Sequence, residues 1–332
     1  MNKFPLLKLQ KEAPQHVVKI MDFIPLIALS LVSKTAKALV ATAKVQFKTI
    51  SMDLRSGYNL LILETADRTS VYLFSNHYGE QLQPPPKQLN IALVKDSENR
   101  RNVWKNLRLS YSQWVIHLKS IFVIQSPVRV LFCKNEYLRT EDICANLVGI
   151  TGSVSFNACR GQRLREIVTN FLPTIEILEF VEGLPRDMAA KISIQNLTSI
   201  ADKSHETACL ENLLLSNAAH IRPSLFSTNP ITDKTINRFL KCWIRGSNPR
   251  LEQFEYYRLG VPAFDVNAIF KRIRVERIPE NVERRLTRTM LACSENSQRV
   301  TTTRGGYDIR NKVGKVVTLL VDRYDLEILV WH

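Results

Sequence analysis

The chain has 332 residues, of which 45% are hydrophobic and 23% are charged, and its formal net charge is +15. A chain of this length and apolar content can bury a sizeable core, which excludes intrinsic disorder. Its longest apolar stretch, residues 24–32, is about half of what a bilayer demands, so no membrane span is predicted.

The first ten residues interrupt their apolar side chains with Lys3 and Lys8, and they lack the cleavage site of a secretory signal. The six cysteines are scattered and form no C-x-x-C pair: Cys133, Cys144, Cys159, Cys209, Cys242 and Cys293. We therefore expect a cytosolic or nuclear protein with reduced thiols and no metal site.

Three short helices are predicted within the first 45 residues. Pro14 can start the first helix and Asp22 ends it; Pro25 begins the second, and Ser33 is a good N-cap for a third that runs to about Lys44. The second helix is apolar nearly all round, and two short neighbours can cover only part of it. Either the C-terminal domain or another protein must cover the remainder.

After residue 45 the pattern changes to short runs that mix β-branched, apolar and polar residues. Strands are predicted over residues 45–52, 58–64 and 70–74. The triple proline at residues 84–86 favours a stiff surface loop, with a ligand for a polyproline-binding domain as the alternative.

From residue 113 onward, helical and extended stretches alternate. Extended segments are predicted over residues 128–133, 153–156, 175–180, 191–195, 219–222 and 251–256. Their midpoints lie roughly 15 to 31 residues apart, which overlaps the period of about 20–29 residues in strand-plus-helix leucine-rich repeats. We favour a leucine-rich-repeat-like curved sheet over an ordinary α/β sheet.

The best-defined helix is predicted over residues 232–245. Thr232 is its N-cap, Asp233 complements the helix dipole, and Gly246 supplies the left-handed stop. Its apolar residues recur at helical spacing on one face: Ile236, Phe239, Leu240, Trp243 and Ile244. This face is predicted to be core, with Trp243 a packing residue.

Three sequence blocks stand in order at the N terminus, over residues 4–9, 17–22 and 26–34. Together they resemble the F-box of the large nematode F-box family. The resemblance implies that the following residues bind a Skp-type adaptor: Phe4, Pro5, Leu6, Leu9, Ile20, Met21, Ile24, Leu26, Leu29, Leu31, Ser33 and Lys34. Gln10 stands where that family commonly has proline.

The string Trp-Ile-Arg-Gly-Ser-Asn-Pro-Arg-Leu-Glu occupies residues 243–252. With the helix before it, the string resembles the core of the type 2 F-box-associated domain. It predicts a helix, a glycine stop, an Asn-Pro turn and a strand beginning at Leu251. Residues 305–310, 316–321 and Trp331 are similar to the closing hairpin of that family, and Gly305 and Gly306 are predicted to form a turn.

No nucleotide-binding, zinc-protease or serine-hydrolase motif occurs, and the six histidines are far apart. Asp322, Asp325 and Glu327 are predicted to belong to a charged strand and its turn rather than to an acid/base site. Residues 271–288 hold seven Lys or Arg and three Glu, which favours a solvated basic face over a phosphate-binding patch. We therefore predict no enzymatic activity and no cofactor.

Taken together, the sequence predicts an α+β protein: a small N-terminal three-helix F-box (residues 1–45), a strand-rich connecting segment (46–126), and a leucine-rich-repeat-like α/β domain with a curved sheet (127–332), which contains the F-box-associated region at about residues 190–258. The predicted function is that of a substrate-recognition subunit of an SCF-type ubiquitin ligase, monomeric within the complex. It would bind a Skp-type adaptor and, through it, cullin, and would present an unknown target protein, with no membrane or specific nucleic-acid binding. The alternative is a repeat scaffold or polyanion-binding protein without ligase association.

Overall fold

The computed structural model describes residues 12–55, 58–67, 69–76, 88–95, 98–105, 109–133, 138–157, 159–181, 186–202, 210–222, 231–258, 262–292 and 295–331. The chain is mixed α+β, as predicted. It divides into two compact units, residues 1–152 and 153–332. The predicted domain boundaries after residues 45 and 126 lie inside the first unit.

The first unit begins with three short helices, α1 (Glu12–Ile20), α2 (Phe23–Ser30) and α3 (Lys34–Thr42). The side chain of Ser33 accepts a hydrogen bond from the backbone N–H of Ala36 at 3.1 Å, so it caps α3 as predicted. Two further helices, α4 (Tyr111–Ile121) and α5 (Thr140–Leu147), follow in the same unit.

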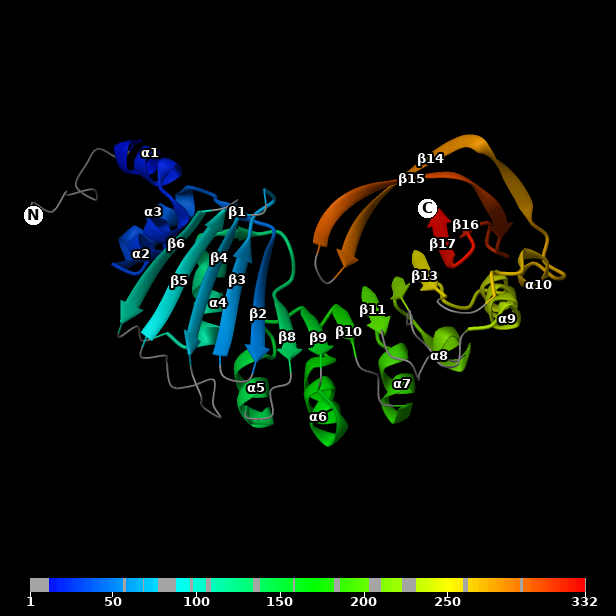
Figure 1. Ribbon diagram of the computed structural model, residues 1–332, viewed down its shortest axis with the longest axis horizontal. Helices are drawn as coiled ribbons and strands as arrows, with labels where there is room; N and C mark the ends of the chain where they lie inside the picture. The colour runs from blue at the N-terminus through cyan, green and yellow to red at the C-terminus, as the bar shows by residue number, and fades with distance from the viewer. Residues whose placement is uncertain are drawn as a thin grey trace, which may run out of the picture. The chain divides into compact units, whose positions relative to one another are not determined.

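An antiparallel meander follows the three helices (Figure 1). Its strands are β2 (Thr49–Arg55), β3 (Tyr58–Glu64), β4 (Ser70–Asn76), β5 (Gln88–Lys95) and β6 (Glu98–Lys105), and β8 (Arg129–Cys133) adds to β2 in parallel. A separate two-stranded sheet joins β1 (Gln46–Phe47) to β7 (Val123–Ile124). Burial alternates along β3 because successive side chains point to opposite faces. The predicted proline loop lies outside the described residues.

Helix α2 is covered largely by the first unit itself. Leu26 and Ile27 are 1% and 0% exposed. The ring of Phe23 lies 5.1 Å from that of Phe47, which lies 4.9 Å from that of Phe122. Residues well beyond the first 45 therefore cover much of the apolar helix that the sequence left uncovered.

The second unit begins with strands that are parallel to one another and separated by helices. The strands are β9 (Ser153–Asn157), β10 (Ile177–Phe180), β11 (Ser199–Asp202), β12 (His220–Arg222) and β13 (Gln253–Tyr257). The helices are α6 (Gly161–Phe171), α7 (Arg186–Ser193), α8 (Leu210–Leu215) and α9 (Asp233–Ile244). Helices α6 and α7 lie on one side of the strands (Figure 1). On that side Phe239 of α9 stacks on Phe254 of β13, with ring centroids 5.5 Å apart.

Four antiparallel strands complete the second unit. They are β14 (Glu276–Ala292), β15 (Glu295–Arg310), β16 (Val316–Val321) and β17 (Asp325–Trp331), and α10 (Val266–Ile269) precedes them. Strand β17 pairs with β13 and joins the antiparallel group to the parallel strands.

Helix α9 agrees closely with its sequence prediction. The side chain of Thr232 accepts from the backbone N–H of Thr235 at 3.1 Å, and Gly246 has φ +106°. Trp243 is 3% exposed, which confirms it as a core residue. The turn and the strand predicted after this helix are also present, as β13.

Two local predictions are wrong. Residues 191–195 are not extended: α7 runs through Ser193, because Met188, Ala189 and Ile192 form one buried helical face. Gly305 and Gly306 do not form a turn between strands but lie inside β15, with φ +67° and +104°, where the register with β14 shifts. A Cβ at Gly306 would lie 2.8 Å from the carbonyl oxygen of Leu319, so this bulge requires glycine.

Candidate functional site

The predicted adaptor-binding residues divide into three groups by their environment. Phe4, Pro5, Leu6 and Leu9 lie outside the described residues. Ile20, Ser33 and Lys34 are exposed, Met21, Leu29 and Leu31 are half-buried, and Ile24 and Leu26 are buried. The three helices therefore present only part of the predicted set to solvent.

Two large apolar side chains stand out on these helices. Ile20, the last residue of α1, is 72% exposed, and Val32, just after α2, is 71% exposed. Sequence reasoning did not include Val32 among the contact residues, although its position directly after the apolar run of α2 is a usable signal. Leu26, in contrast, supports the surface from inside.

The C-terminal end of α2 is anchored to α4 by a polar contact. The hydroxyl of Ser30 donates to the carbonyl of Ile27 at 2.7 Å and lies 2.7 Å from Nε2 of His117. Because the single hydroxyl hydrogen of Ser30 is used on Ile27, Nε2 of His117 must be the donor in the second bond. Burial, and secondarily the charge of Lys37, lowers the pKa of His117 to about 4, so the ring is neutral near pH 7.

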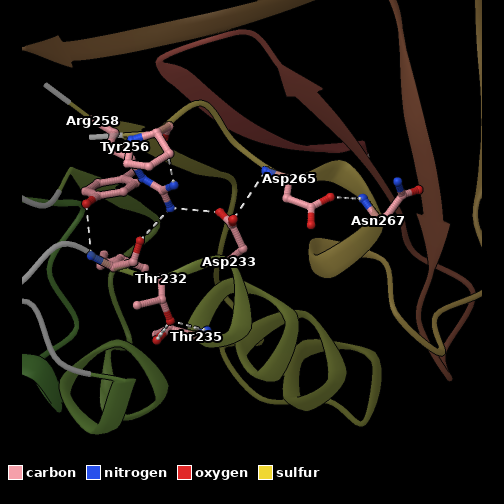
Figure 2. A network of polar contacts seen from close by, with 9 residues as sticks. Thr232, Asp233, Thr235, Tyr256, Arg258, Asp265 and Asn267 are labelled. Atoms are coloured by element: carbon pink, nitrogen blue, oxygen red, sulfur yellow. Dashed lines mark hydrogen bonds and ion pairs between the residues drawn. The ribbon is translucent and has the colours of Figure 1, made fainter. Parts of the chain in front are cut away.

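In the second unit, Arg258 links the start of α9 to the end of β13 (Figure 2). Its side chain is 7% exposed, and its Nη2 donates to the carbonyl of Ile231 at 2.7 Å and to Oδ1 of Asp233 at 2.9 Å. The guanidinium carbon lies 4.0 Å from the ring centroid of Phe264. The hydroxyl oxygen of Tyr256 accepts from the N–H of Ile231 at 2.9 Å, and burial raises the pKa of this phenol.

The same network extends to α10. Oδ2 of Asp233 accepts from the N–H of Asp265 at 3.2 Å, and Oδ1 of Asp265 accepts from the N–H of Asn267 at 2.9 Å (Figure 2). Asp233 thus bonds the Arg258 guanidinium and the backbone of Asp265, and Asp265 bonds the backbone at the start of α10. We therefore assign this network to positioning α9 rather than to chemistry.

Asn248, in the turn between α9 and β13, links that turn to the C-terminal end of α8. It is 4% exposed, and its Nδ2 donates to the carbonyls of Leu213 and Ser216 at 2.7 Å each. Its φ of +51° lies in the left-handed region, which asparagine tolerates better than most residues. The Asn-Pro turn thus joins two successive helix–strand pairs.

The face of the parallel strands opposite Phe254 carries polar side chains in register. Ser155 on β9 donates to Glu179 on β10 at 2.9 Å, and Arg222 on β12 donates through Nε to Glu255 on β13 at 2.7 Å. Glu179 is 3% exposed, but the Arg222 and Glu255 side chains are 37% and 31% exposed. The accessible part of this face therefore lies on β12 and β13.

The polar side chains of this face continue through His220, which is half-buried, and Gln253, which is buried. Nδ1 of His220 lies 3.3 Å from Oε1 of Gln253, and Nε2 of Gln253 donates to Glu327 of β17 at 2.8 Å. Sequence reasoning missed these residues as a surface. Their polar character at alternate positions of short strands is the signal that could have identified it.

The described part of the chain shows no candidate metal centre. No group of three or more His, Cys, Asp or Glu side chains there is placed to hold a metal ion. Burial raises the pKa of the Asp325 carboxyl, with smaller contributions from Asp322 and Glu255, but Asp322 and Asp325 belong to the turn between β16 and β17. None of the described helices has both the length and the apolar character needed to cross a bilayer.

Comparison with known proteins now identifies the class. Residues 189–256 match the family described as F-box associated. This range includes the string at residues 243–252 that carries the sequence resemblance. Residues 189–256 are therefore similar to an F-box-associated domain.

A second likeness is to a nematode protein. The chain is similar to the F-box associated domain-containing protein sdz-33 of Caenorhabditis elegans, with 23% identity over 251 residues that cover 76% of this chain and 77% of that protein. No solved structure matches the chain. The matched family range does not include α1, α2 or α3, so the F-box identity of the N-terminal helices stays a prediction.

Proposed function

We propose that this protein is the substrate-recognition subunit of an SCF-type ubiquitin ligase. The observation that carries the proposal is the F-box-associated match at residues 189–256, together with an F-box-like sequence in the first 45 residues. The helices α1–α3 would form the F-box and bind a Skp-type adaptor, which connects the protein to cullin. The parallel strands β9–β13 and their helices would form the leucine-rich-repeat-like domain.

In this role the chain performs no chemistry of its own. It holds a target protein near a ubiquitin-charged enzyme and so raises the effective concentration of the target's lysines. On the adaptor side, we assign the direct contact to Ile20 and Val32, the two most exposed large apolar side chains of the described residues near α2. Interfaces of this kind depend on a few large apolar anchors.

The test is binding of the purified full chain to a purified Skp-type adaptor by isothermal titration calorimetry. The double variant Ile20→Ser with Val32→Ser is expected to bind at least about tenfold more weakly, since burying two such anchors contributes on the order of 1.4 kcal/mol or more. The matched control is Val103→Ser with Ile116→Ser, whose side chains are 53% and 54% exposed elsewhere in the first unit. The control is expected to bind like the wild type.

Two results would overturn the proposal. One is a folded, soluble wild-type chain that binds no Skp-type adaptor at micromolar concentration. The other is a control variant that loses as much affinity as the Ile20/Val32 variant, because the contact would then lie elsewhere. Thermal melts of all three proteins separate loss of binding from loss of folding.

The second candidate function is a repeat scaffold or polyanion-binding protein without ligase association. The net charge of +15 favours it. Steep, salt-sensitive binding to RNA or DNA in the absence of adaptor binding would support this second function.

A further inference from the structure

Several cations of the second unit gather around the C-terminal half of α9. We define the basic strip as seven residues: Arg238, Lys241 and Arg245 on α9, Lys271 and Arg272 just after α10, and Lys312 and Lys315 in the turn between β15 and β16. Five of them are exposed, and Lys241 and Lys315 are half-buried. The strip therefore collects charges from three segments that are far apart in the sequence.

Hydrogen bonds place these three segments against one another. Nζ of Lys241 donates to Oδ1 of Asn237 at 2.7 Å, and Nδ2 of Asn237 donates to the carbonyl of Lys271 at 3.0 Å. The N–H of Lys312 donates to the carbonyl of Ile244, the last residue of α9, at 3.0 Å. The strip is thus continuous from the end of α10, across α9, to the β15–β16 turn.

The strip also lacks acidic partners. Of the ion pairs formed among the described residues of the second unit, none includes a strip residue, whereas Arg165, Arg222 and Arg284 are paired with Asp187, Glu255 and Asp308. A helix C-terminus attracts cations through its partial negative charge. That effect accounts for Lys241, Arg245 and Lys312 but leaves the other four cations unexplained.

An exposed apolar side chain stands at the β15–β16 end of the strip. Val313, between Lys312 and Gly314, is 70% exposed. Oδ1 of Asn311 accepts from the N–H of Val313 at 3.1 Å and from the N–H of Lys315 at 2.9 Å, so the turn that presents the valine is held in place. A surface that binds only phosphates gains nothing from an exposed valine, because phosphate contacts come from cations and hydrogen-bond donors.

We propose that the basic strip is a docking surface for an acidic segment of a partner protein, with an apolar side chain of that segment seated against Val313. The cations would complement its carboxylates, and the valine would fix its position along the strip. This inference does not require adaptor binding. If the proposed ligase function holds as well, the acidic segment would belong to the target.

The test measures fluorescence anisotropy of labelled probes with the full chain at low and high salt. The probes are a Glu-rich peptide with one central Leu, the same peptide without the Leu, and single-stranded RNA. The test variant Arg245→Ser/Lys271→Ser/Lys312→Ser is compared with Lys105→Ser/Lys119→Ser/Lys191→Ser, which removes three exposed cations from elsewhere on the chain. Arg245→Glu is a second variant with only one altered position.

We expect the Leu-containing peptide to bind, and the strip variant to weaken it about tenfold while the control variant changes it less than about twofold. Arg245→Glu is expected to weaken it about threefold or more. Val313→Ser should weaken the Leu-containing peptide and leave the all-Glu peptide unchanged. Equal binding by strip and control variants would overturn the proposal, and so would strip-dependent binding of RNA without binding of either peptide.

Discussion

Helices α2 and α9 are both short, but they are stabilised in opposite ways. Helix α2 is apolar nearly all round, has no side-chain cap at Asp22, and is buried at Ile24, Leu26 and Ile27. Helix α9 is capped by Thr232, buries one face and turns its cations outward. The side chains that a helix can offer to a partner therefore depend on which of its faces the rest of the chain already buries.

For α2, the apolar surface that remains exposed to solvent is small and lies near the helix ends. Most of its apolar surface is used inside the first unit, so the number of apolar residues in the sequence overstates the area available to an adaptor. For α9 the exposed face is electrostatic, and its binding should therefore depend on salt in a way that binding at α2 does not.

The largest expected effect comes from substituting a side chain that α2 buries inside the first unit. Leu26→Ala should lower the free energy of unfolding of the first unit by about 2–5 kcal/mol, because the side chain is 1% exposed and leaves a cavity. Leu26→Asp should unfold that unit, since it buries an unpaired carboxylate. Urea denaturation measures both.

Ile20→Ala is the control for Leu26, because its side chain is 72% exposed. It should change the free energy of unfolding by no more than about 0.5 kcal/mol. A Leu26→Asp protein with wild-type stability would show that α2 is not covered by its own unit.

A smaller effect is expected from releasing the start of α9. Arg258→Met should cost about 2–4 kcal/mol, because it leaves Asp233 and the carbonyl of Ile231 without their donor. Arg258→Lys should restore little, since an ammonium cannot reproduce the planar guanidinium over Phe264.

Thermal or urea unfolding of the Arg258 variants gives the measurement. Arg250→Met, at an exposed arginine nearby in the chain, is the matched control and should be neutral to within about 0.5 kcal/mol. Full rescue by lysine would mean that charge alone, and not the fork of donors, holds α9.

The smallest effect concerns pH. The pKa of His117 is about 4 in the folded chain against an ordinary 6.5, so the folded state disfavours the protonated ring. This contribution to the free energy of unfolding is fully present above pH 6.5. It is lost as the pH falls toward 4, because the unfolded chain binds a proton in this range that the folded chain does not bind. Because the ring is only half-buried, the loss at pH 5 should be about 1 kcal/mol.

His117→Gln removes the titrating group and keeps a donor for Ser30. Urea midpoints measured from pH 7.5 to 4.5 should fall less steeply for this variant than for the wild type. His16→Gln, at an exposed histidine, should keep the wild-type slope. Identical slopes for all three proteins would contradict the buried, neutral assignment of His117.

Local signals made part of the fold predictable. The caps at Ser33 and Thr232 and the stop at Gly246 act within one helical turn, so their sequence patterns were sufficient. The helix–turn–strand order around residues 243–252 followed from the same kind of signal. The prediction was wrong at residues 191–195. Two isoleucines at alternate positions there resemble the pattern of a strand, but the buried face of α7 makes the chain helical through Ser193.

The contacts that define the candidate sites were not predictable in this way. Ser30 and His117 are 87 positions apart, and Asn237 and Lys271 are 34 apart. The basic strip exists only because three such segments meet. Burial of Leu26 likewise depends on residues beyond the N-terminal helices, so its role could not be separated from that of Ile20 by sequence alone.

The pairing of β13 has a consequence for what the family range means physically. The matched residues, 189–256, begin inside α7 and stop one residue before the end of β13. In the folded chain, β13 is hydrogen-bonded to β12 on one side and to β17 on the other. A peptide cut to the matched range would leave the β17-facing edge of β13 bare and open to aggregation, so we expect residues 189–256 to depend on β17 for a soluble fold.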